Sequence, residues 1–195
     1  MKIRGPLFFL AGLAPALGAG WLAFPSLLYR RVEQPLSFSH RTHAGEKGGM
    51  ACSDCHSIGA DGRFAGIPRL EKCVGCHAQA VGTTSAEKLF VDEYVAKGKE
   101  VPWLVYSRQP ENVYFPHADH VAKGKLGCET CHGPHGSTDR LRPFEVNRIS
   151  GYSRDIWGPS IARVGRRSWE GMKMTDCIRC HEGRNRSTSC LACHK

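Results

Sequence analysis

Every cysteine in this sequence belongs to one short pattern, Cys-x-x-Cys-His, which occurs five times and leaves no cysteine over. The copies are Cys52-Ser-Asp-Cys55-His56, Cys73-Val-Gly-Cys76-His77, Cys128-Glu-Thr-Cys131-His132, Cys177-Ile-Arg-Cys180-His181 and Cys190-Leu-Ala-Cys193-His194. On a turn of helix, residues three and four apart lie on the same face. Each copy therefore presents two thiols and one imidazole to a common ligand.

This pattern predicts covalent attachment of c-type haem, in which the thiols form thioethers with the haem vinyl groups and the histidine binds iron. Zinc clusters and redox-active cysteine pairs also use Cys-x-x-Cys. Neither requires a histidine after every second cysteine. We predict five covalently attached haems, with the ten cysteines as cofactor-binding residues and the five motif histidines as proximal iron ligands.

The chain is basic, with 27 Lys and Arg against 18 Asp and Glu and a formal net charge of +9. Such an excess often marks a nucleic-acid or membrane-surface partner. Here the negative propionates of five haems would offset most of it. Because no nucleic-acid-binding motif accompanies the charge, we expect no nucleic-acid partner.

Residues 5–29 form an uncharged apolar segment with Lys2 and Arg4 before it and Arg30 and Arg31 after it. Twenty-five helical residues are long enough to cross a hydrocarbon core of about 30 Å. The alternative is a cleaved signal peptide, whose apolar region is shorter and ends in a small-x-small site. We predict a retained single-pass anchor over residues 1–31.

Haem attachment decides the orientation of this anchor, since basic residues flank it on both sides. Bacteria attach c-type haem outside the cytoplasmic membrane, so we expect an inner-membrane protein with its haem domain in the periplasm. Residues 32–107 would form a first module with two haems and a connecting helix, and residues 108–195 a second with three. So little chain for each haem predicts short helices and irregular loops wrapped on the haems.

An internal repeat precedes the first and third motifs. Residues 38–56, FSHRTHAGEKGGMACSDCH, match residues 115–132, FPHADHVAKGKLGCETCH. Both read Phe-x-His-x-x-His, then a Gly- and Lys-rich turn, then Cys-x-x-Cys-His. Five histidines lie outside the motifs and could fill the five remaining axial positions, and four of them are in this repeat: His40, His43, His117, His120 and His135. We predict that they are distal iron ligands.

Three further features bear on ligation and packing. Met172 and Met174 lie near a motif, and a thioether ligand would raise the potential of its haem; apolar packing is the alternative. Seven arginines between residues 140 and 167 could clamp propionates or bind an acidic partner, or form a solvated loop. Residues 85–100 predict a short helix, with Ser85 as its cap, a Glu93–Lys97 pair and Gly98 at its end.

The pattern Phe-x-His-x-x-His before Cys-x-x-Cys-His resembles the small class III multihaem cytochromes. In that family the first histidine of the pair serves the haem of the next motif, and the second serves a haem attached farther along. The resemblance implies that His40 pairs with His56 and His117 with His132. It also implies that His120 pairs with His194 or His181. His43 and His135 would serve two of the remaining haems, His43 that of His77.

A narrower resemblance concerns residues 101–120, VPWLVYSRQPENVYFPHADH, and residues 174–181, MTDCIRCH. They are similar to the membrane-anchored pentahaem subunit of alternative complex III and to the multihaem subunit of the quinone reductase complex. The latter is usually described with six haems, and ten cysteines permit five, which favours the former. The resemblance implies a periplasmic iron–sulfur subunit and a polytopic quinone-binding membrane subunit as partners, with a soluble cytochrome or terminal oxidase as acceptor.

We therefore expect an electron-transfer subunit of a respiratory quinol-oxidising membrane complex. A haem with both axial positions filled by protein cannot bind a substrate, and no nucleophile–base pair indicates a catalytic site of the chain's own. Two alternatives remain open. One is a stand-alone membrane-anchored quinol dehydrogenase that feeds a periplasmic reductase. The other is a multihaem reductase of a small oxyanion, which would need a five-coordinate haem.

Overall fold

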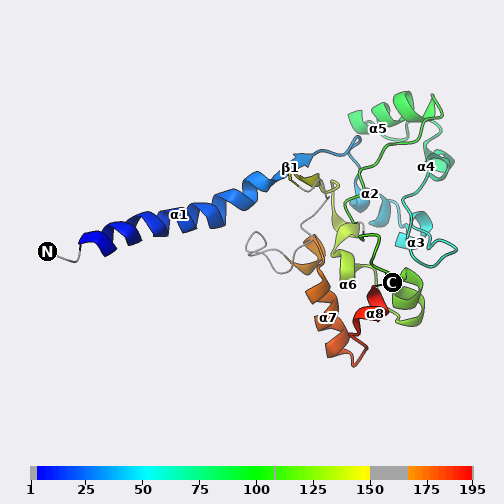
Figure 1. Ribbon diagram of the computed structural model, residues 1–195. Helices are drawn as coiled ribbons and strands as arrows, with labels where there is room; N and C mark the ends of the chain where they lie inside the picture. Colours follow the sequence, from blue (N-terminus) through cyan, green and yellow to red (C-terminus); the bar gives the residue numbers. More distant parts are fainter. Residues whose placement is uncertain (1–3, 108, 150–166, 195) are drawn as a thin grey trace.

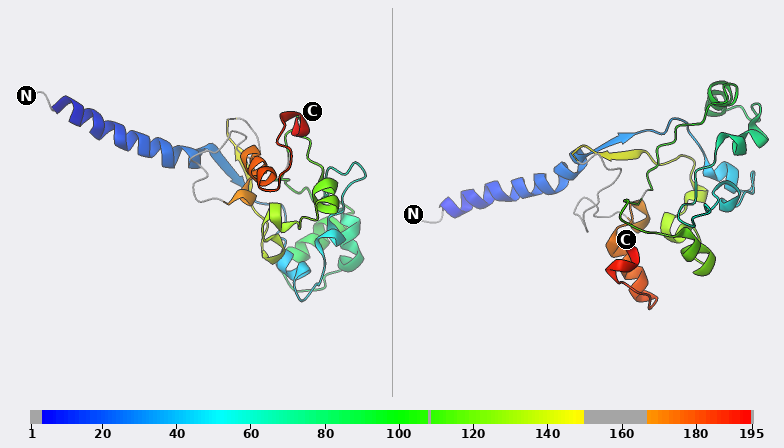
Figure 2. Two further views of the ribbon diagram at one scale, coloured as in Figure 1. Left: turned by 90° about the horizontal axis from the view of Figure 1, so that it is seen from below. Right: turned by 45° about the vertical axis from the view of Figure 1, so that its right-hand side comes forward.

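A long N-terminal helix and a body of short helices and irregular loops make up the computed structural model of the chain (Figure 1). The structure describes residues 4–107, 109–149 and 167–194. The helix, α1 (Arg4–Leu28), extends away from the body in each view (Figures 1 and 2). Within these residues, no helix combines the length and the apolar character that a membrane crossing requires.

A two-stranded antiparallel ribbon joins the end of α1 to the body, which the sequence pattern does not predict. β1 (Tyr29–Val32) pairs with β2 (Phe144–Asn147), so that Tyr29 lies opposite Asn147. The amide of Arg148 donates to the carbonyl of Leu28 at 2.8 Å and extends the pairing into the end of the helix. A segment far along the chain thus fixes the direction in which α1 leaves the body.

Five short helices carry the Cys-x-x-Cys-His copies: α3 (Cys52–Cys55), α4 (Leu70–His77), α6 (Glu129–His132), α7 (Met174–Gly183) and α8 (Cys190–Cys193). The amide of His132 donates to the carbonyl of Cys128 at 3.0 Å, the helical i to i−4 bond. His56 and His194 bond in the same way to the first cysteines of their motifs, both at 2.8 Å. The helical turn expected for the motif is confirmed.

The four histidines of the repeat that lie outside the Cys-x-x-Cys-His motifs are in or next to two further helical turns. α2 (His40–Ala44) begins after Ser39, whose hydroxyl accepts from the amide of Thr42 at 3.2 Å. η2 (Ala118–Lys123) follows His117 and is wound as a π-helix, with the amide of Gly124 donating to the carbonyl of Asp119. Two single-turn helices also lie in the body, η3 (His135–Ser137) and η5 (Ser168–Glu170).

The helix predicted over residues 85–100 is present as α5 (Ser85–Phe90), which continues as a π-turn, η1 (Val91–Val95). The prediction that Ser85 caps this helix is wrong. Thr84 has extended backbone angles, and its hydroxyl accepts from the amide of Glu87 at 3.1 Å, so it caps the helix one residue earlier. The Glu93–Lys97 ion pair forms at 2.6 Å, and Gly98 ends the segment with a φ of +58°.

The body has little apolar core of its own. Among the described residues, the buried apolar side chains are Leu36 and Phe90, and no large side chain is fully buried. Hydrogen bonds join the two expected modules, from the amide of Arg41 to Thr138 at 3.0 Å and from the amide of Ala118 to Gly62 at 2.9 Å. Division of the chain at residue 108 stays a prediction.

Candidate metal centres

Eight of the ten histidines face one another as four pairs of imidazole rings. The ring centres are 6.4 Å apart in His40–His56, 6.0 Å in His43–His77, 6.2 Å in His117–His132 and 6.1 Å in His120–His181. An imidazole nitrogen binds a transition metal at about 2 Å, so two imidazoles on opposite sides of one iron have ring centres about 6 Å apart. All four pairs fit that separation.

Hydrogen bonds at Nδ1 fix how these rings are turned. Carbonyl oxygens accept from Nδ1 of His56 (Gly66, 2.7 Å), His43 (Ser39, 2.8 Å), His120 (Pro116, 2.9 Å), His181 (Ser187, 2.7 Å), His194 (Asn112, 3.2 Å) and His117 (Arg63). A carbonyl accepts only from a protonated Nδ1, which leaves the lone pair on Nε2. In these histidines Nε2 is therefore the nitrogen that is left to bind a metal.

The repeated phenylalanine orients both histidines that follow it. Phe38 stacks on His43 with ring centres 4.4 Å apart and lies edge-on to His40 at 5.0 Å. In the second copy, Phe115 stacks on His120 at 4.3 Å and lies edge-on to His117 at 5.0 Å. The two copies thus have the same local geometry, as their identical spacing predicts. One phenylalanine holds two candidate ligands that serve different motifs.

All ten cysteines are free thiols, and each is exposed or half-exposed. Sulfurs of different motifs lie near one another. Burial, and next the nearby Cys128, raise the pKa of the Cys52 thiol, and these two sulfurs share a hydrogen bond. Burial, and next the nearby Cys55, raise the pKa of Cys73. The first motif therefore lies between the second and the third.

The same relation continues into the C-terminal motifs. Burial, and next the nearby Cys180, raise the pKa of Cys131. Burial raises the pKa of Cys177, and Asp176, Cys131 and Cys193 raise it further. The third motif thus borders the fourth, and the fourth borders the fifth. The amide of Tyr114 donates to the carbonyl of Cys193, and Nδ1 of His194 donates to the carbonyl of Asn112, so that α8 is attached to the chain just before the second repeat.

His135 occupies a different environment from the other spare histidines. Its ring centre lies 6.1 Å from that of His40 and 6.0 Å from that of Tyr106. Burial lowers its pKa to about 4, with a further contribution from Arg142. In the described part of the chain, no ring contact joins His135 to His194. Its role as a distal ligand stays a prediction.

The methionines and arginines singled out in the sequence have less specific surroundings. Met172 is half-buried, and Met174 is 61 % exposed. Arg142 donates to the carbonyl of Trp169 at 3.0 Å and lies 3.6 Å from the carboxylate of Glu170. Of the remaining arginines in this segment, Arg154, Arg163 and Arg166 fall outside the described residues.

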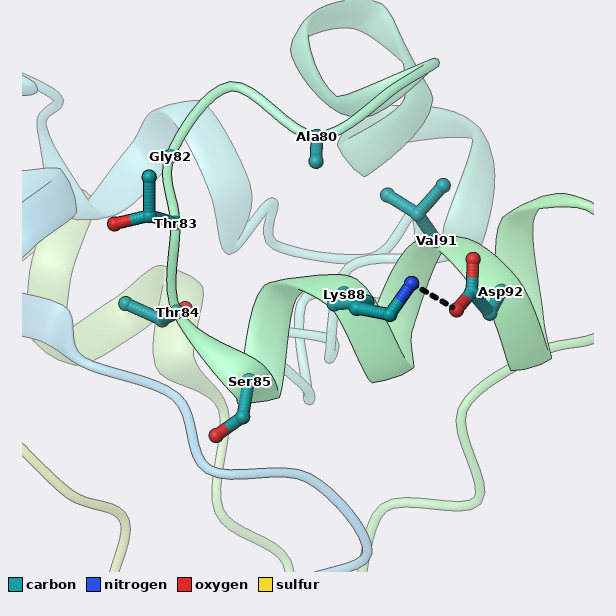
Figure 3. Close-up of a pocket in the computed structure, with 8 residues that line it drawn as sticks. All are labelled: Ala80, Gly82, Thr83, Thr84, Ser85, Lys88, Val91 and Asp92. Carbon is teal, nitrogen blue, oxygen red and sulfur yellow. Dashed lines mark ion pairs between the residues drawn. The ribbon is translucent and has the colours of Figure 1, made fainter.

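Glu87 contacts His77, a candidate iron ligand, and no sequence pattern predicts this contact. Nδ1 of His77 lies 2.9 Å from Glu87 Oε1. The spacing Thr84-x-x-Glu87 signals only a helix start, and His77 is ten residues away on another helix. Beside this loop is a shallow pocket of about 440 Å³ that no predicted ligand lines. Figure 3 shows Lys88, one of the residues that line it, pointing toward Asp92, with which it forms an ion pair at 3.3 Å.

Comparison with known proteins shows the kind of protein to which the chain is similar. A family model described as cytochrome c7 and related cytochrome c matches residues 113–195. The chain is also 39 % identical over 202 residues to the "Menaquinone reductase, multiheme cytochrome c subunit" of Nitratidesulfovibrio vulgaris. That match covers 96 % of this chain and 89 % of the relative.

Proposed function

The chain belongs to the family of multihaem cytochromes c, and from this premise we propose that it is the electron-transfer subunit of a respiratory membrane complex that reacts with a quinone. Four imidazole pairs at the separation expected for one iron are the observation that carries the proposal. The relative from Nitratidesulfovibrio vulgaris, named as a subunit of a menaquinone reductase, supports the link to a quinone.

Five c-type haems are the proposed cofactors, one on each cysteine pair. Each haem supplies reversible one-electron chemistry when bound. The chain would hold each haem through two thiols, and four of the irons would be bound by the histidine pairs His40 and His56, His43 and His77, His117 and His132, and His120 and His181. His194 would be the proximal ligand of the fifth. At these four sites the paired histidines would leave no position for a substrate, so the sites would serve electron transfer.

The thiol contacts support a linear order of the five sites. The site of His77 is at one end, followed by those of His56, His132 and His181, and that of His194 is at the other end. This order rests on the neighbouring sulfurs Cys73 and Cys55, Cys52 and Cys128, Cys131 and Cys180, and Cys177 and Cys193. Each interior site borders two others, so electrons entering at one end would cross the whole chain.

The proposed location is the periplasmic face of a bacterial inner membrane, with residues 1–31 as a single-pass anchor. The sequence supports this, because residues 5–29 carry no charge. Exposure in α1 supports it too: Leu7, Phe8, Phe9 and Leu10 are each more than half exposed, and an exposed apolar surface of this kind is typical of a membrane or protein contact. The proposed partners are a polytopic quinone-binding membrane subunit and a periplasmic iron–sulfur subunit.

Two directions of electron flow fit such a complex. The name of the relative favours flow toward menaquinone. The five attachment motifs favour the quinol-oxidising arrangement of alternative complex III, from which electrons would continue to a soluble cytochrome or terminal oxidase. In both cases the chain relays electrons and the quinone reacts in a partner subunit.

Purification of the tagged full chain from its native membrane tests the proposal. We expect co-purification of a membrane subunit and an iron–sulfur subunit. Haems that are reduced chemically and then oxidised by a menaquinone analogue would assign flow toward the quinone. Oxidised haems that are reduced by the corresponding quinol would assign the opposite direction. A chain that purifies alone and reacts directly with quinol would overturn the proposal in favour of a stand-alone dehydrogenase.

A further inference from the structure

Nδ1 of His77 meets a charged side chain. Five other paired histidines, and the unpaired His194, direct Nδ1 to a neutral backbone carbonyl, and Nδ1 of His40 is buried without a hydrogen-bond partner. Nδ1 of His77 instead lies 2.9 Å from the carboxylate of Glu87. Among the ion pairs of the described residues, the His77–Glu87 contact is the one that involves a histidine.

The carboxylate of Glu87 is held in place from several sides. The amides of Val81 and Gly82 donate to its two oxygens, each at 2.7 Å. Its own backbone amide is tied to the hydroxyl of Thr84 at the start of α5. The loop that delivers these amides runs along the pocket drawn in Figure 3. Only 13 % of the Glu87 side chain and 26 % of the His77 side chain are exposed.

Three hydrogen bonds therefore converge on this carboxylate, two from backbone amides and one from the His77 imidazole. A carboxylate is a stronger acceptor than a neutral carbonyl. Its hydrogen bond draws the Nδ1 proton away from the ring and makes Nε2 more basic. A more basic axial ligand favours ferric over ferrous iron, and hydrogen bonding to the ligands is one of the means by which proteins set haem potential.

We propose that Glu87 is a positioning residue that lowers the reduction potential of the haem bound by His77 and so makes this end of the relay its low-potential terminus. The inference rests on the proposed function, because it requires a haem on Cys73 and Cys76. In the proposed linear order the site of His77 is at one end, next to the site of His56, since Cys73 lies near Cys55. A low potential at a terminus gives the relay a direction, since electrons entering there move to sites of higher potential.

Replacement of Glu87 by glutamine in the haem-loaded full chain tests the inference. Glutamine keeps the size, and its one carbonyl oxygen can accept from one of the two backbone amides, but it removes the charge beside His77. We expect the potential of one haem to rise by about 59 mV for an about tenfold loss of ferric preference, while the other potentials stay in place. Redox titration followed by optical absorption and EPR resolves the individual haems.

Three variants separate this effect from a general loss of structure. Glu93→Gln removes the same charge from the adjoining helical turn, where Glu93 pairs with Lys97, and should shift no haem. Thr84→Ala weakens the start of α5 without touching His77, and should lower thermal stability without raising one potential selectively. Glu87→Asp keeps the charge and should give a potential between those of the wild type and Glu87→Gln.

The outcomes separate failure of the inference from failure of the proposed function. A haem attached to Cys73 and Cys76, shown by peptide mass, whose potential is the same in wild type and Glu87→Gln would overturn the inference alone. Absence of haem from these cysteines in the wild-type protein would overturn the proposed function. If Glu87→Gln does not accumulate, the other two variants decide. The inference would also be overturned if the potential of the haem on Cys73 and Cys76 is unchanged in Glu87→Asp but shifted in Thr84→Ala.

Discussion

The rings of His117 and His132 face each other with 6.2 Å between their centres and 4° between their planes. The rings of His43 and His77 are equally close but inclined by 54°. The separation of the ring centres is therefore similar in the two pairs, whereas the angle between the ring planes differs. Two imidazoles whose ring planes are parallel would donate electrons into the same iron d orbital. The energy difference between this orbital and the other d orbital of similar energy would then be largest. The two sites should be distinguishable by magnetic resonance.

Loss of His117 should open one axial position. In His117→Ala we expect one haem to change from low-spin to high-spin and to bind added cyanide, because water or an exogenous ligand replaces the imidazole. The EPR signal that disappears should be the more rhombic one, as expected for parallel ligand planes. Low-temperature EPR of the oxidised protein measures both changes.

Asp119→Asn is the matched control for this variant. Asp119 lies on the same helical turn and pairs with Lys123 in an exposed ion pair. It should leave every haem low-spin. A His117→Ala protein that retains all low-spin signals would show that this imidazole is not an iron ligand and would remove the central support for the paired sites.

The repeat shows how many of the imidazole pairs can be predicted from the sequence. The spacing Phe-x-His-x-x-His places His40 opposite His56 and His117 opposite His132, because each pair is joined by a short turn of similar length. His43 lies opposite His77, as the resemblance implied. For His120 the sequence left two partners open, and the structure places it opposite His181. A local pattern cannot choose between two motifs that are both far away along the chain.

Other features depend wholly on distant contacts and have no local signal. Glu87 reaches His77 only because α4 and α5 pack together. The pairing of β1 with β2 joins residues more than a hundred positions apart, and either strand alone is too short to predict. The order of the five motifs in space differs from their order in sequence, since the first lies between the second and the third.

Substitution of the stacking phenylalanine should cost stability and loosen two ligands at once. Phe115 contacts both His117 and His120, and an aromatic pair contributes about 0.5–1.5 kcal/mol beyond its buried area. We expect Phe115→Leu to lower the free energy of unfolding by about 1 kcal/mol, measured by urea denaturation. Phe64, which is 53 % exposed, supplies the control: Phe64→Leu should stay within about 0.5 kcal/mol. Equal losses in both variants would contradict a special role for Phe115.

A charge in the middle of α1 should release the chain from the membrane if residues 1–31 are its anchor. An arginine at the centre of a membrane helix costs about 2.5–3.5 kcal/mol on insertion scales. We expect Leu13→Arg to move the protein from the washed membrane fraction to the soluble fraction, while Leu13→Phe stays with the membrane. Immunoblots of both fractions after an alkaline wash provide the measurement. A wild-type chain that the wash removes, or a mature N-terminus beyond residue 31, would contradict the anchor.

Removal of a terminal attachment site should be tolerated better than removal of a central one. In the proposed linear order the last motif is terminal, with Cys193 near Cys177 of the fourth, whereas the third motif lies near both the first and the fourth. We therefore expect a variant with Cys190→Ala and Cys193→Ala to keep four haems and most of its thermal stability. A variant with Cys128→Ala and Cys131→Ala should lose more than one haem or fail to accumulate, because its neighbours lose a packing partner on each side. Intact mass and the absorbance of extracted haem give the count for each protein, and the wild type should give five. Equal losses in the two variants would contradict the linear order, since that order is what makes one site terminal and the other central.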